Sequence, residues 1–264
     1  MSFLTLESGV RLRVSDRGSG PAIVLVHGWK MSHRIFDRVV PALEDRFRVV
    51  AFDLRGMGES DKPDSRYDFE ELSDDLGAVL ERLDLDDVTL VGWSMGCTVS
   101  LEYLRRGGGR VGRLVLVNGP LRLTRTDDFP FTMTEAELHG YVDALAARWP
   151  EGERAFTEEA FLEPLPQIVD WIYGIALQTP LDVVLKTVRA QERIDHREVL
   201  ARLDVPVLAI YCTGDPYYPT ELAGYIAEQA PRGEALVLER SGHFPFLEAD
   251  TERFVEALEA FSSR

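Results

Sequence analysis

Ser94 has the setting that most clearly predicts chemistry. It stands at the centre of Gly-Trp-Ser-Met-Gly (residues 92–96), after an apolar run at 88–91 and before an apolar-periodic stretch at 97–105. This order predicts a buried strand, a sharp turn and a helix, with no room for a Cβ atom at the two glycines. The turn exposes the serine and aims the first helical amides at whatever its hydroxyl attacks. Ser94 is therefore the candidate nucleophile; the alternative is an N-capping serine in a glycine-rich loop.

His243 is the candidate general base, because a serine hydroxyl is a weak nucleophile until a base within hydrogen-bond reach removes its proton. The chain has five histidines. Three of them, His33, His139 and His196, fall in predicted helices away from strand ends. His27 lies in a tight turn, where we expect it to bond to the backbone. His243 follows the last predicted strand in a Ser-Gly-His loop, which leaves it as the base, against the alternative of a structural histidine.

Asp215 is the candidate acid that holds the base in the correct tautomer. It follows the predicted strand at 205–212, beside the strand that leads to the base. Asp53 also follows a strand but lies across the sheet, and Asn118 carries no charge. The alternative is a Gly-Asp-Pro turn without a catalytic role. The order Ser, Asp, His along the chain is the order expected of a serine hydrolase built on a doubly wound sheet.

Strands and helices alternate along residues 1–120, and their ends position these side chains. A hairpin is predicted over residues 3–16, further strands at 22–26, 47–53, 88–92 and 113–118, and helices at 32–45, 68–83 and 97–105. With the two later strands, this predicts an α/β fold with a doubly wound, mostly parallel sheet of eight strands. Right-handed crossovers bring the carboxyl ends of the parallel strands to one rim.

The alternation stops at residue 121. Residues 121–190 contain no convincing strand, and their apolar clusters and helix signals predict three to five short helices. Strands at 205–212 and 234–239 and a helix at 249–262 then complete the sheet and its cover. We therefore predict a core domain of residues 1–120 and 191–264, with a helical cap, residues 121–190, inserted after the sixth strand. Because the insert begins at the carboxyl end of a strand, on the rim that carries the site, we expect it to cover the site as a lid.

The composition limits the classes of partner. The chain has 264 residues and a net charge of −16, which would repel nucleic-acid phosphates and anionic lipid headgroups. The sequence offers no signal peptide and no apolar stretch of membrane-spanning length. We expect a cytoplasmic protein that acts on a small molecule, as a monomer or a homodimer, without nucleic-acid or membrane partners.

Cofactor motifs are missing from the sequence. It contains no His-Glu-x-x-His, no cluster of cysteine and histidine, and no glycine-rich loop that follows a strand and opens a helix. No metal or other cofactor is therefore expected. There are two cysteines, Cys97 in a predicted helix and Cys212 at a strand end. We expect both to be buried reduced thiols, and the sequence does not give the distance between them.

Five motifs resemble those of the α/β-hydrolase superfamily over almost the whole chain. They are His27-Gly28-Trp29 for the oxyanion loop, residues 53–60 for the turn after the next strand, residues 92–96 for the nucleophile elbow, and Gly214-Asp215 and Gly242-His243 for the acid and base loops. The resemblance implies an oxyanion hole made by the backbone amides of Trp29 and Met95. Cys97 departs from the pattern, because relatives usually carry a glycine there.

Within the superfamily, the chain is similar to small cofactor-free esterases, enol-lactonases and perhydrolases (non-haem haloperoxidases) with a helical cap. Haloalkane dehalogenases are disfavoured because they need a carboxylate where this chain has Ser94. The resemblance implies hydrolysis of a carboxylic ester or lactone of a small, largely apolar substrate through an acyl-enzyme. Perhydrolase or haloperoxidase-type activity at the same triad is the alternative. A ligand-binding receptor and a cofactor-free oxygenase are the alternatives from other classes.

Aromatic residues are the expected lining of the substrate pocket. We predict Trp29 from the oxyanion loop, and Tyr141, Trp171 and Tyr173 from the insert. For each residue of the insert, a role in the core of the cap is an equally good alternative.

Overall fold

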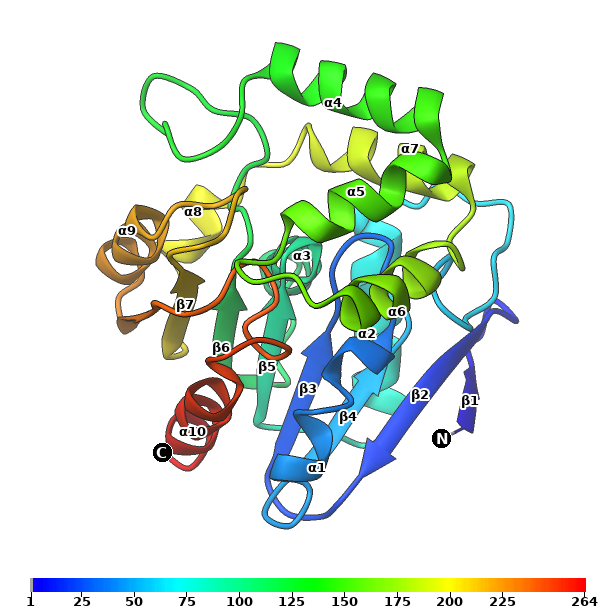
Figure 1. Cartoon of the computed structure of the whole chain (residues 1–264). Helices are drawn as coiled ribbons and strands as arrows, with labels where there is room; N and C mark the ends of the chain where they lie inside the picture. The colour runs from blue at the N-terminus through cyan, green and yellow to red at the C-terminus, as the bar shows by residue number, and fades with distance from the viewer. Residues whose placement is uncertain (1) are drawn as a thin grey trace.

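An eight-stranded sheet runs through the centre of the molecule, with strand order β1-β2-β4-β3-β5-β6-β7-β8 (Figure 1). The computed structural model describes residues 2–264. The strands are β1 (Ser2–Thr5), β2 (Arg11–Arg17), β3 (Ala22–Val26), β4 (Arg48–Phe52), β5 (Val88–Trp93), β6 (Val111–Val117), β7 (Val207–Cys212) and β8 (Gly233–Leu238). The β1–β2 and β2–β4 pairs are antiparallel, and the strands from β4 to β8 pair in parallel. The predicted mostly parallel eight-stranded sheet is confirmed.

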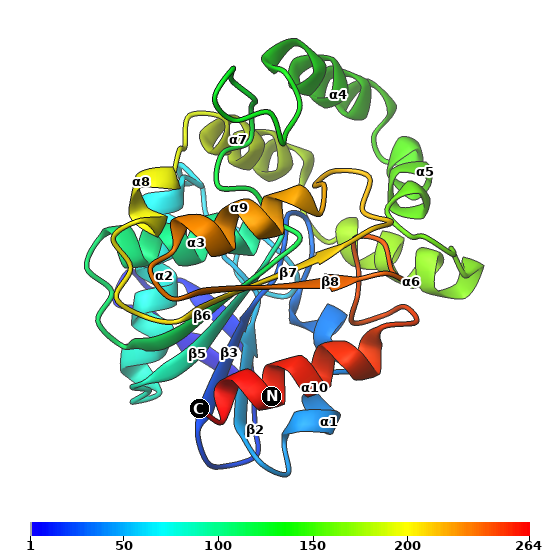
Figure 2. The same ribbon diagram turned by 90° about the vertical axis from the view of Figure 1, so that its left-hand side faces the viewer.

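The middle strands are buried on both faces, as their continuous apolar sequences require. Every residue of β5 and of β7 is buried. One apolar cluster fills the space between the sheet and helices α2 (Phe69–Arg82), α3 (Met95–Arg105), α8 (Arg197–Leu200) and α9 (Glu221–Gln229). A second cluster lies on the opposite face, under η1 (His33–Phe36), α1 (Val40–Leu43) and α10 (Thr251–Ser262). Figure 2 shows α3 and α9 above the sheet and α10 and α1 below it.

The single helix predicted at residues 32–45 is wrong. The chain forms the short 3-10 helix η1, capped by Ser32, and then the four-residue helix α1. Pro41 lies in the first turn of α1. It has no N–H to donate to the preceding turn of a continuous helix, and it favours the first turn of a new helix. The backbone N–H of His33 also donates to the Asp53 carboxylate at 2.6 Å, which draws this segment toward the end of β4.

The helical insert, residues 121–190, lies over the carboxyl ends of the strands (Figure 1). Its helices are α4 (Glu135–Arg148), α5 (Glu151–Glu159), α6 (Pro166–Ala176) and α7 (Leu181–Gln191). Between residues 121 and 190 β-structure is limited to isolated bridges. Across residues 2–264 no single helix passes a length and hydropathy test for a membrane span; α6 and α7 pass it only as a pair bent by 88°. The division into core and cap at residues 120 and 190 stays a prediction.

Candidate active site

Ser94 joins β5 to α3 in a strained conformation. Its φ of 54° and ψ of −122° lie where residues with a side chain are rarely found. A Cβ atom at Gly92 would approach the Gly96 carbonyl oxygen to 2.5 Å, and one at Gly96 would meet the carbonyl oxygen of Val26. The two glycines therefore let β5, α3 and β3 approach closely enough to form the turn. This geometry is that of a nucleophile elbow.

The structure brings Ser94, His243 and Asp215 into one chain of hydrogen bonds. The His243 Nε2 atom lies 3.1 Å from Ser94 Oγ, and its Nδ1 atom lies 2.8 Å from Asp215 Oδ2. The Asp215 side chain is fully buried, whereas 9% of the Ser94 surface remains exposed. A carboxylate accepts a hydrogen bond from Nδ1–H, and this leaves Nε2 free to accept the serine proton.

The loop after β7 holds Asp215 in place. Its second carboxylate oxygen, Oδ1, accepts the backbone N–H groups of Tyr217 at 2.8 Å and Tyr218 at 3.3 Å. One oxygen is thus used by the loop and the other faces His243. These contacts orient the carboxylate before any substrate binds.

Asn118 and Trp93 hold the loop that carries His243. The Asn118 amide donates to the carbonyl oxygens of Gly242 at 3.1 Å and His243 at 3.3 Å, and accepts the Cys212 N–H at 3.0 Å. The Trp93 indole donates to the His243 carbonyl oxygen at 2.8 Å. Sequence reasoning considered Asn118 only as an acid and missed this role. The signal was available, because Asn118 is an amide at a strand end on the same rim.

The helical insert contacts the base loop directly. The backbone N–H of His243 donates to the Ala160 carbonyl oxygen at 2.7 Å. Glu248 spans the same junction, since its two carboxylate oxygens accept the N–H groups of Gly242 and Leu162, each at 2.8 Å. Burial raises the pKa of Glu248, although these amides act in the opposite direction. The position of the insert is therefore linked to that of His243.

The loop after β3 and the first residue of α3 each place one backbone amide beside Ser94. Trp29 and Met95 line the same pocket as Ser94, and within residues 2–264 their backbone N–H groups have no hydrogen-bond acceptor. The indole of Trp29 donates to the Val184 carbonyl oxygen of α7 at 3.1 Å, which anchors the loop to the insert. Two free amides at this place are suited to holding an oxyanion.

His27 ties this loop to the end of β4. Its Nδ1 atom lies 2.8 Å from the Gly28 carbonyl oxygen, and its Nε2 atom accepts the Leu54 N–H at 3.0 Å. The imidazole therefore donates through Nδ1 and accepts through Nε2, which requires the neutral ring. Burial lowers the pKa of His27 to about 4, although Asp53 and the Gly28 carbonyl oxygen act to raise it. The prediction that His27 bonds to the backbone is confirmed.

The remaining histidines lie away from Ser94. His33 Nδ1 is 2.6 Å from Asp53 Oδ1, directly after β4, and β3 lies between β4 and the strand that leads to Ser94. His196 Nε2 is 2.9 Å from a carboxylate oxygen of Glu102 on α3. The third, His139, bonds to Glu192 within the insert, at 2.7 Å.

A mostly apolar pocket lies between the insert and Ser94. Its empty space, including the open mouth, is about 760 Å³, within the range of small-molecule sites. Its aromatic lining consists of Trp29, Trp93, Tyr141, Phe156, Tyr217, Tyr218 and Phe244. The predicted residues Trp29 and Tyr141 both line this pocket, and their contact with a substrate stays a prediction. Sequence reasoning missed the tyrosines at 217 and 218, whose signal was their place directly after Asp215-Pro216.

Trp171 and Tyr173 do not line this pocket, so their predicted role is wrong. They lie on α6, whose inward face is made by Val169, Ile172 and Ile175. Residues next to inward positions on a helix point to its flanks, because successive side chains are about 100° apart. The Trp171 ring accordingly lies 5.8 Å from the Arg34 guanidinium.

A buried ion pair joins the oxyanion loop to α5. Lys30 Nζ lies 2.7 Å from Glu153 Oε2, and both side chains are almost fully buried, at 1% and 0% exposure. The ammonium also lies 4.3 Å from the Trp29 ring and 4.2 Å from the Phe156 ring. Burial lowers the pKa of Lys30, and Glu153 opposes this shift. The pair neutralises the charge at this wall of the pocket.

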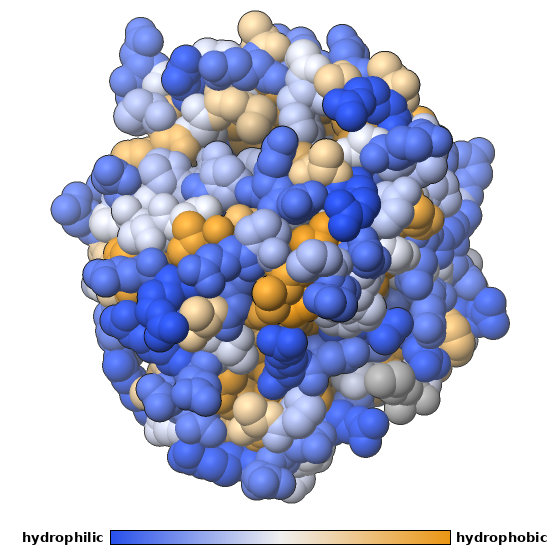
Figure 3. Space-filling model, in the orientation of Figure 1, coloured by the Kyte–Doolittle hydropathy of each residue, from blue (hydrophilic) through white to orange (hydrophobic). Residues whose placement is uncertain are grey.

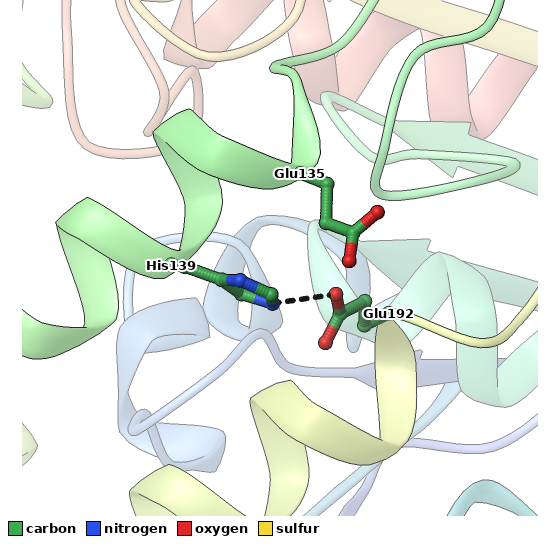
Figure 4. A group of neighbouring side chains, drawn as sticks. All are labelled: Glu135, His139 and Glu192. Carbon is green, nitrogen blue, oxygen red and sulfur yellow. Dashed lines mark hydrogen bonds and ion pairs between the residues drawn. The ribbon is translucent and has the colours of Figure 1, made fainter.

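One group of side chains could hold a metal ion within residues 2–264. Glu135 and His139 of α4 and Glu192 after α7 place their ligand atoms within 4.8 Å of one another (Figure 4). Figure 4 shows His139 and Glu192 already paired with each other. The group lies on the insert and shares no residue with the pocket at Ser94.

Both cysteines are buried free thiols, as predicted. Cys97 Sγ lies 3.0 Å from the Gly92 carbonyl oxygen, and Gly119 has no side chain to occupy the space beside it. The departure at Cys97 is therefore accommodated without opening the elbow.

Known proteins resemble the chain over its whole length. The family described as alpha/beta hydrolase fold matches residues 21–250. A non-heme chloroperoxidase, CPO-A1, from Kitasatospora aureofaciens is 29% identical over 100% of both chains. A pimeloyl-(acyl-carrier protein) methyl ester esterase from Nitrosomonas europaea is 28% identical over 94% of this chain and 98% of its own length. The solved structure of an esterase from Exiguobacterium antarcticum superposes with a TM-score of 0.94 at 28% identity, covering 100% of this chain and 99% of that one. With its sheet and elbow, the chain belongs to the alpha/beta hydrolase fold family.

Proposed function

We propose that this protein is a serine hydrolase that cleaves a carboxylic ester or lactone of a small, largely apolar substrate. The observation that carries the proposal is the hydrogen-bonded chain from Asp215 through His243 to Ser94, at 2.8 Å and 3.1 Å, facing a mostly apolar pocket. Relatives named as esterases support the same reaction class.

In the first half-reaction, Ser94 Oγ attacks the carbonyl carbon while His243 Nε2 takes its proton. The negative charge that develops on the carbonyl oxygen is held by the amides of Trp29 and Met95. Asp215 stabilises the imidazolium and keeps Nδ1 protonated. The carbon–oxygen bond to the alcohol then breaks, and the alcohol leaves with the proton from His243.

In the second half-reaction, His243 takes a proton from water, and the resulting hydroxide attacks the acyl-enzyme at the same carbon. The bond to Ser94 breaks, and the proton returns to Ser94 Oγ. The product acid leaves, and the starting state is restored. In this scheme the helical insert acts as a lid, and its contact with the base loop through the Ala160 carbonyl oxygen supports that role.

Labelling with a fluorophosphonate tests the assignment. The wild-type peptide that contains Ser94 gains the mass of the phosphonyl group, and Ser94→Ala gains none. Hydrolysis of p-nitrophenyl esters falls at least a thousandfold in Ser94→Ala, because the nucleophile is gone while the pocket remains. The thermal midpoint stays near that of the wild type. Hydrolysis within about tenfold of wild type by the variant contradicts the assignment.

Perhydrolase activity is the second candidate, since relatives of this chain are named chloroperoxidase and bromoperoxidase. Hydrogen peroxide would replace water in the second half-reaction, and the acyl group would leave as a peracid. With acetic acid as the acyl donor, water leaves when Ser94 is acylated, and hydrogen peroxide then takes the acyl group. Peracid formation from acetic acid and hydrogen peroxide, compared in wild type and Ser94→Ala, measures this activity directly.

Labelling and turnover measured together separate two other functions from the hydrolase. A ligand-binding receptor on this fold would be labelled but would release product slowly, and a cofactor-free oxygenase would not need acylation of Ser94.

A cytoplasmic location is part of the proposal and is supported by the two buried free thiols, which suit a reducing compartment. The proposed partner is a small-molecule ester or lactone.

A further inference from the structure

Two phenol hydroxyls in the pocket lack a partner. Tyr141 comes from α4 and Tyr217 from the loop after Asp215, and both side chains line the pocket. The hydroxyl oxygen of each is buried and has no hydrogen-bond partner within residues 2–264. Buried polar groups are nearly always paired in folded proteins, because an unpaired one loses its bonds to water without replacement. Two such groups in one pocket indicate a ligand that pairs them.

The two tyrosines lie on either side of Phe156. The Tyr141 and Phe156 ring centroids are 5.1 Å apart, and those of Phe156 and Tyr217 are 5.4 Å apart. The Tyr217 ring also stands edge-on to the His243 ring at 5.0 Å. An aromatic wall therefore leads from the base toward the insert, and the unpaired hydroxyls belong to that wall.

Nearby polar groups on the same wall are already paired. Lys30 is bound to Glu153 at 2.7 Å, and Glu153 also accepts the hydroxyl of Thr157 at 3.4 Å. The Gln191 amide donates to the hydroxyl of Thr98 at 2.8 Å. Because Glu153 already neutralises Lys30, an anionic group of a substrate would find no free cation on this wall. The ligand that this wall favours is neutral.

The hydroxyls act as donors at neutral pH. Burial raises the pKa of Tyr141 and that of Tyr217, and the Asp215 carboxylate raises the pKa of Tyr217 further. Both phenols therefore keep their protons, and each can donate one hydrogen bond to a carbonyl oxygen.

We propose that the hydroxyls of Tyr141 and Tyr217 bind a neutral carbonyl oxygen on the substrate, separate from the carbonyl that Ser94 attacks. The substrate class is then an ester or lactone that carries a second, uncharged carbonyl group, such as a keto group, on an otherwise apolar chain. This inference rests on the proposed hydrolase function and narrows it. A site built around buried donors discriminates against an analogue without the acceptor, because that analogue leaves the donors unpaired.

Matched ester pairs test the inference. One pair is p-nitrophenyl 5-oxohexanoate and p-nitrophenyl hexanoate, and a second pair, 4-oxopentyl and pentyl butanoate, carries the keto group on the alcohol side. The measured quantity is kcat/KM for the oxo ester divided by that for its alkyl partner. Tyr141→Phe and Tyr217→Phe each lower this ratio about three- to tenfold in at least one pair, and the double variant lowers it further.

Tyr173→Phe is the matched control, because Tyr173 lies on α6 outside the pocket and its variant keeps the wild-type ratio. The thermal midpoints of Tyr141→Phe and Tyr217→Phe stay equal to that of the wild type or rise, since each change removes an unpaired buried group. A fall of more than about 5 °C assigns the hydroxyls a structural role and overturns the inference.

The failure of this inference differs from failure of the proposed function. Unchanged ratios in both pairs, or an equal loss for oxo and alkyl esters, overturn the role of the hydroxyls while Ser94 is still labelled. If Ser94 is not labelled and neither ester is cleaved, the hydrolase function and this inference both fail.

Discussion

Three side chains from distant parts of the chain meet at Ser94. His243 lies 149 residues from Ser94 and 28 residues from Asp215 in sequence, yet both contacts have hydrogen-bond length. Backbone amides hold the Asp215 carboxylate, and the Asn118 amide holds the backbone of the loop that carries His243. A site held in this way is organised before substrate binds, which is what acyl transfer requires.

His27 makes the stability of the protein depend on pH at the scale of one residue. Its pKa is lowered to about 4 by burial, whereas in the unfolded chain it is near 6.5. Between these values the unfolded state binds more protons, so stability is lost as pH falls from about 6.5 toward 4. The contribution lost between pH 7 and pH 5 is about 2 kcal/mol.

His27→Gln removes this dependence, because glutamine can still accept the Leu54 N–H but does not titrate. We expect the variant to be less stable than wild type at pH 7 and the difference to shrink by about 2 kcal/mol at pH 5. Urea unfolding at the two pH values measures it. Parallel losses of stability in both proteins would show that His27 does not titrate in this range.

At the scale of elements, the helical insert is bound to the loop that carries His243 and to the loop after β3. The Ala160 carbonyl oxygen accepts the N–H of His243 at the base loop, and Val184 and Glu153 bind the loop after β3. The helix α4 is attached less deeply, through a small apolar cluster made by Leu123, Leu138, Val142 and Val188. The elements that surround the pocket therefore differ in how firmly they are held.

Glu153→Gln tests the buried ion pair between α5 and the oxyanion loop. The Lys30 charge stays buried without its partner, so we expect a loss of about 3 to 5 kcal/mol in the free energy of unfolding. The control on the same helix is Glu158→Gln, because Glu158 and Arg154 form an exposed pair whose side chains are 51% and 42% accessible. That change costs less than about 1 kcal/mol. Equal effects in urea unfolding would contradict the role of the buried pair.

The pH dependence of Glu153→Gln gives a second check. Without the carboxylate, burial lowers the pKa of Lys30 further, so the unfolded state binds more protons than the folded state as pH rises above neutrality. The stability deficit of the variant therefore decreases between pH 7 and pH 9. A constant deficit would indicate that the lost packing, and not the lysine charge, is responsible.

At the scale of the whole molecule, two apolar clusters enclose the sheet and a charged surface surrounds them. Figure 3 shows mainly hydrophilic residues on the face it presents, with apolar residues in separate small areas. The net charge of −16 keeps that surface strongly acidic. Both thiols are sealed in the interior, and burial raises the pKa of Cys97 to about 12 and that of Cys212 still further.

Thiol labelling reports on the opening of the whole molecule. In the native protein, neither thiol should react with a disulfide-exchange reagent at pH 8, because both thiols are buried and protonated. In guanidinium chloride both of its two cysteines should react. The rate in mild denaturant should follow global unfolding. Rapid reaction of one native thiol would show a local opening, either of α3 at Cys97 or of the end of β7 at Cys212.

The sequence by itself determined the sheet, the elbow and the candidates for the triad. These features depend on local patterns, since the period of the apolar residues predicts each strand and helix, and parallel topology brings strand ends to one rim. The polar residues that directly follow strands are therefore the candidates for such a site. The break in the helix at 32–45 was missed although Pro41 marks it in the sequence, and its second cause, the bond from His33 to Asp53, is a contact between separate elements.

Only the tertiary structure decided what surrounds Ser94. The pairing of Lys30 with Glu153 joins residues 123 apart, and no local pattern marks either as buried. The exclusion of Trp171 and Tyr173 from the pocket depended on the rotation of α6, and the inclusion of Tyr217 depended on the path of one loop. Pockets are formed where elements from distant parts of the chain pack, so their lining follows from three-dimensional packing and not from local periodicity.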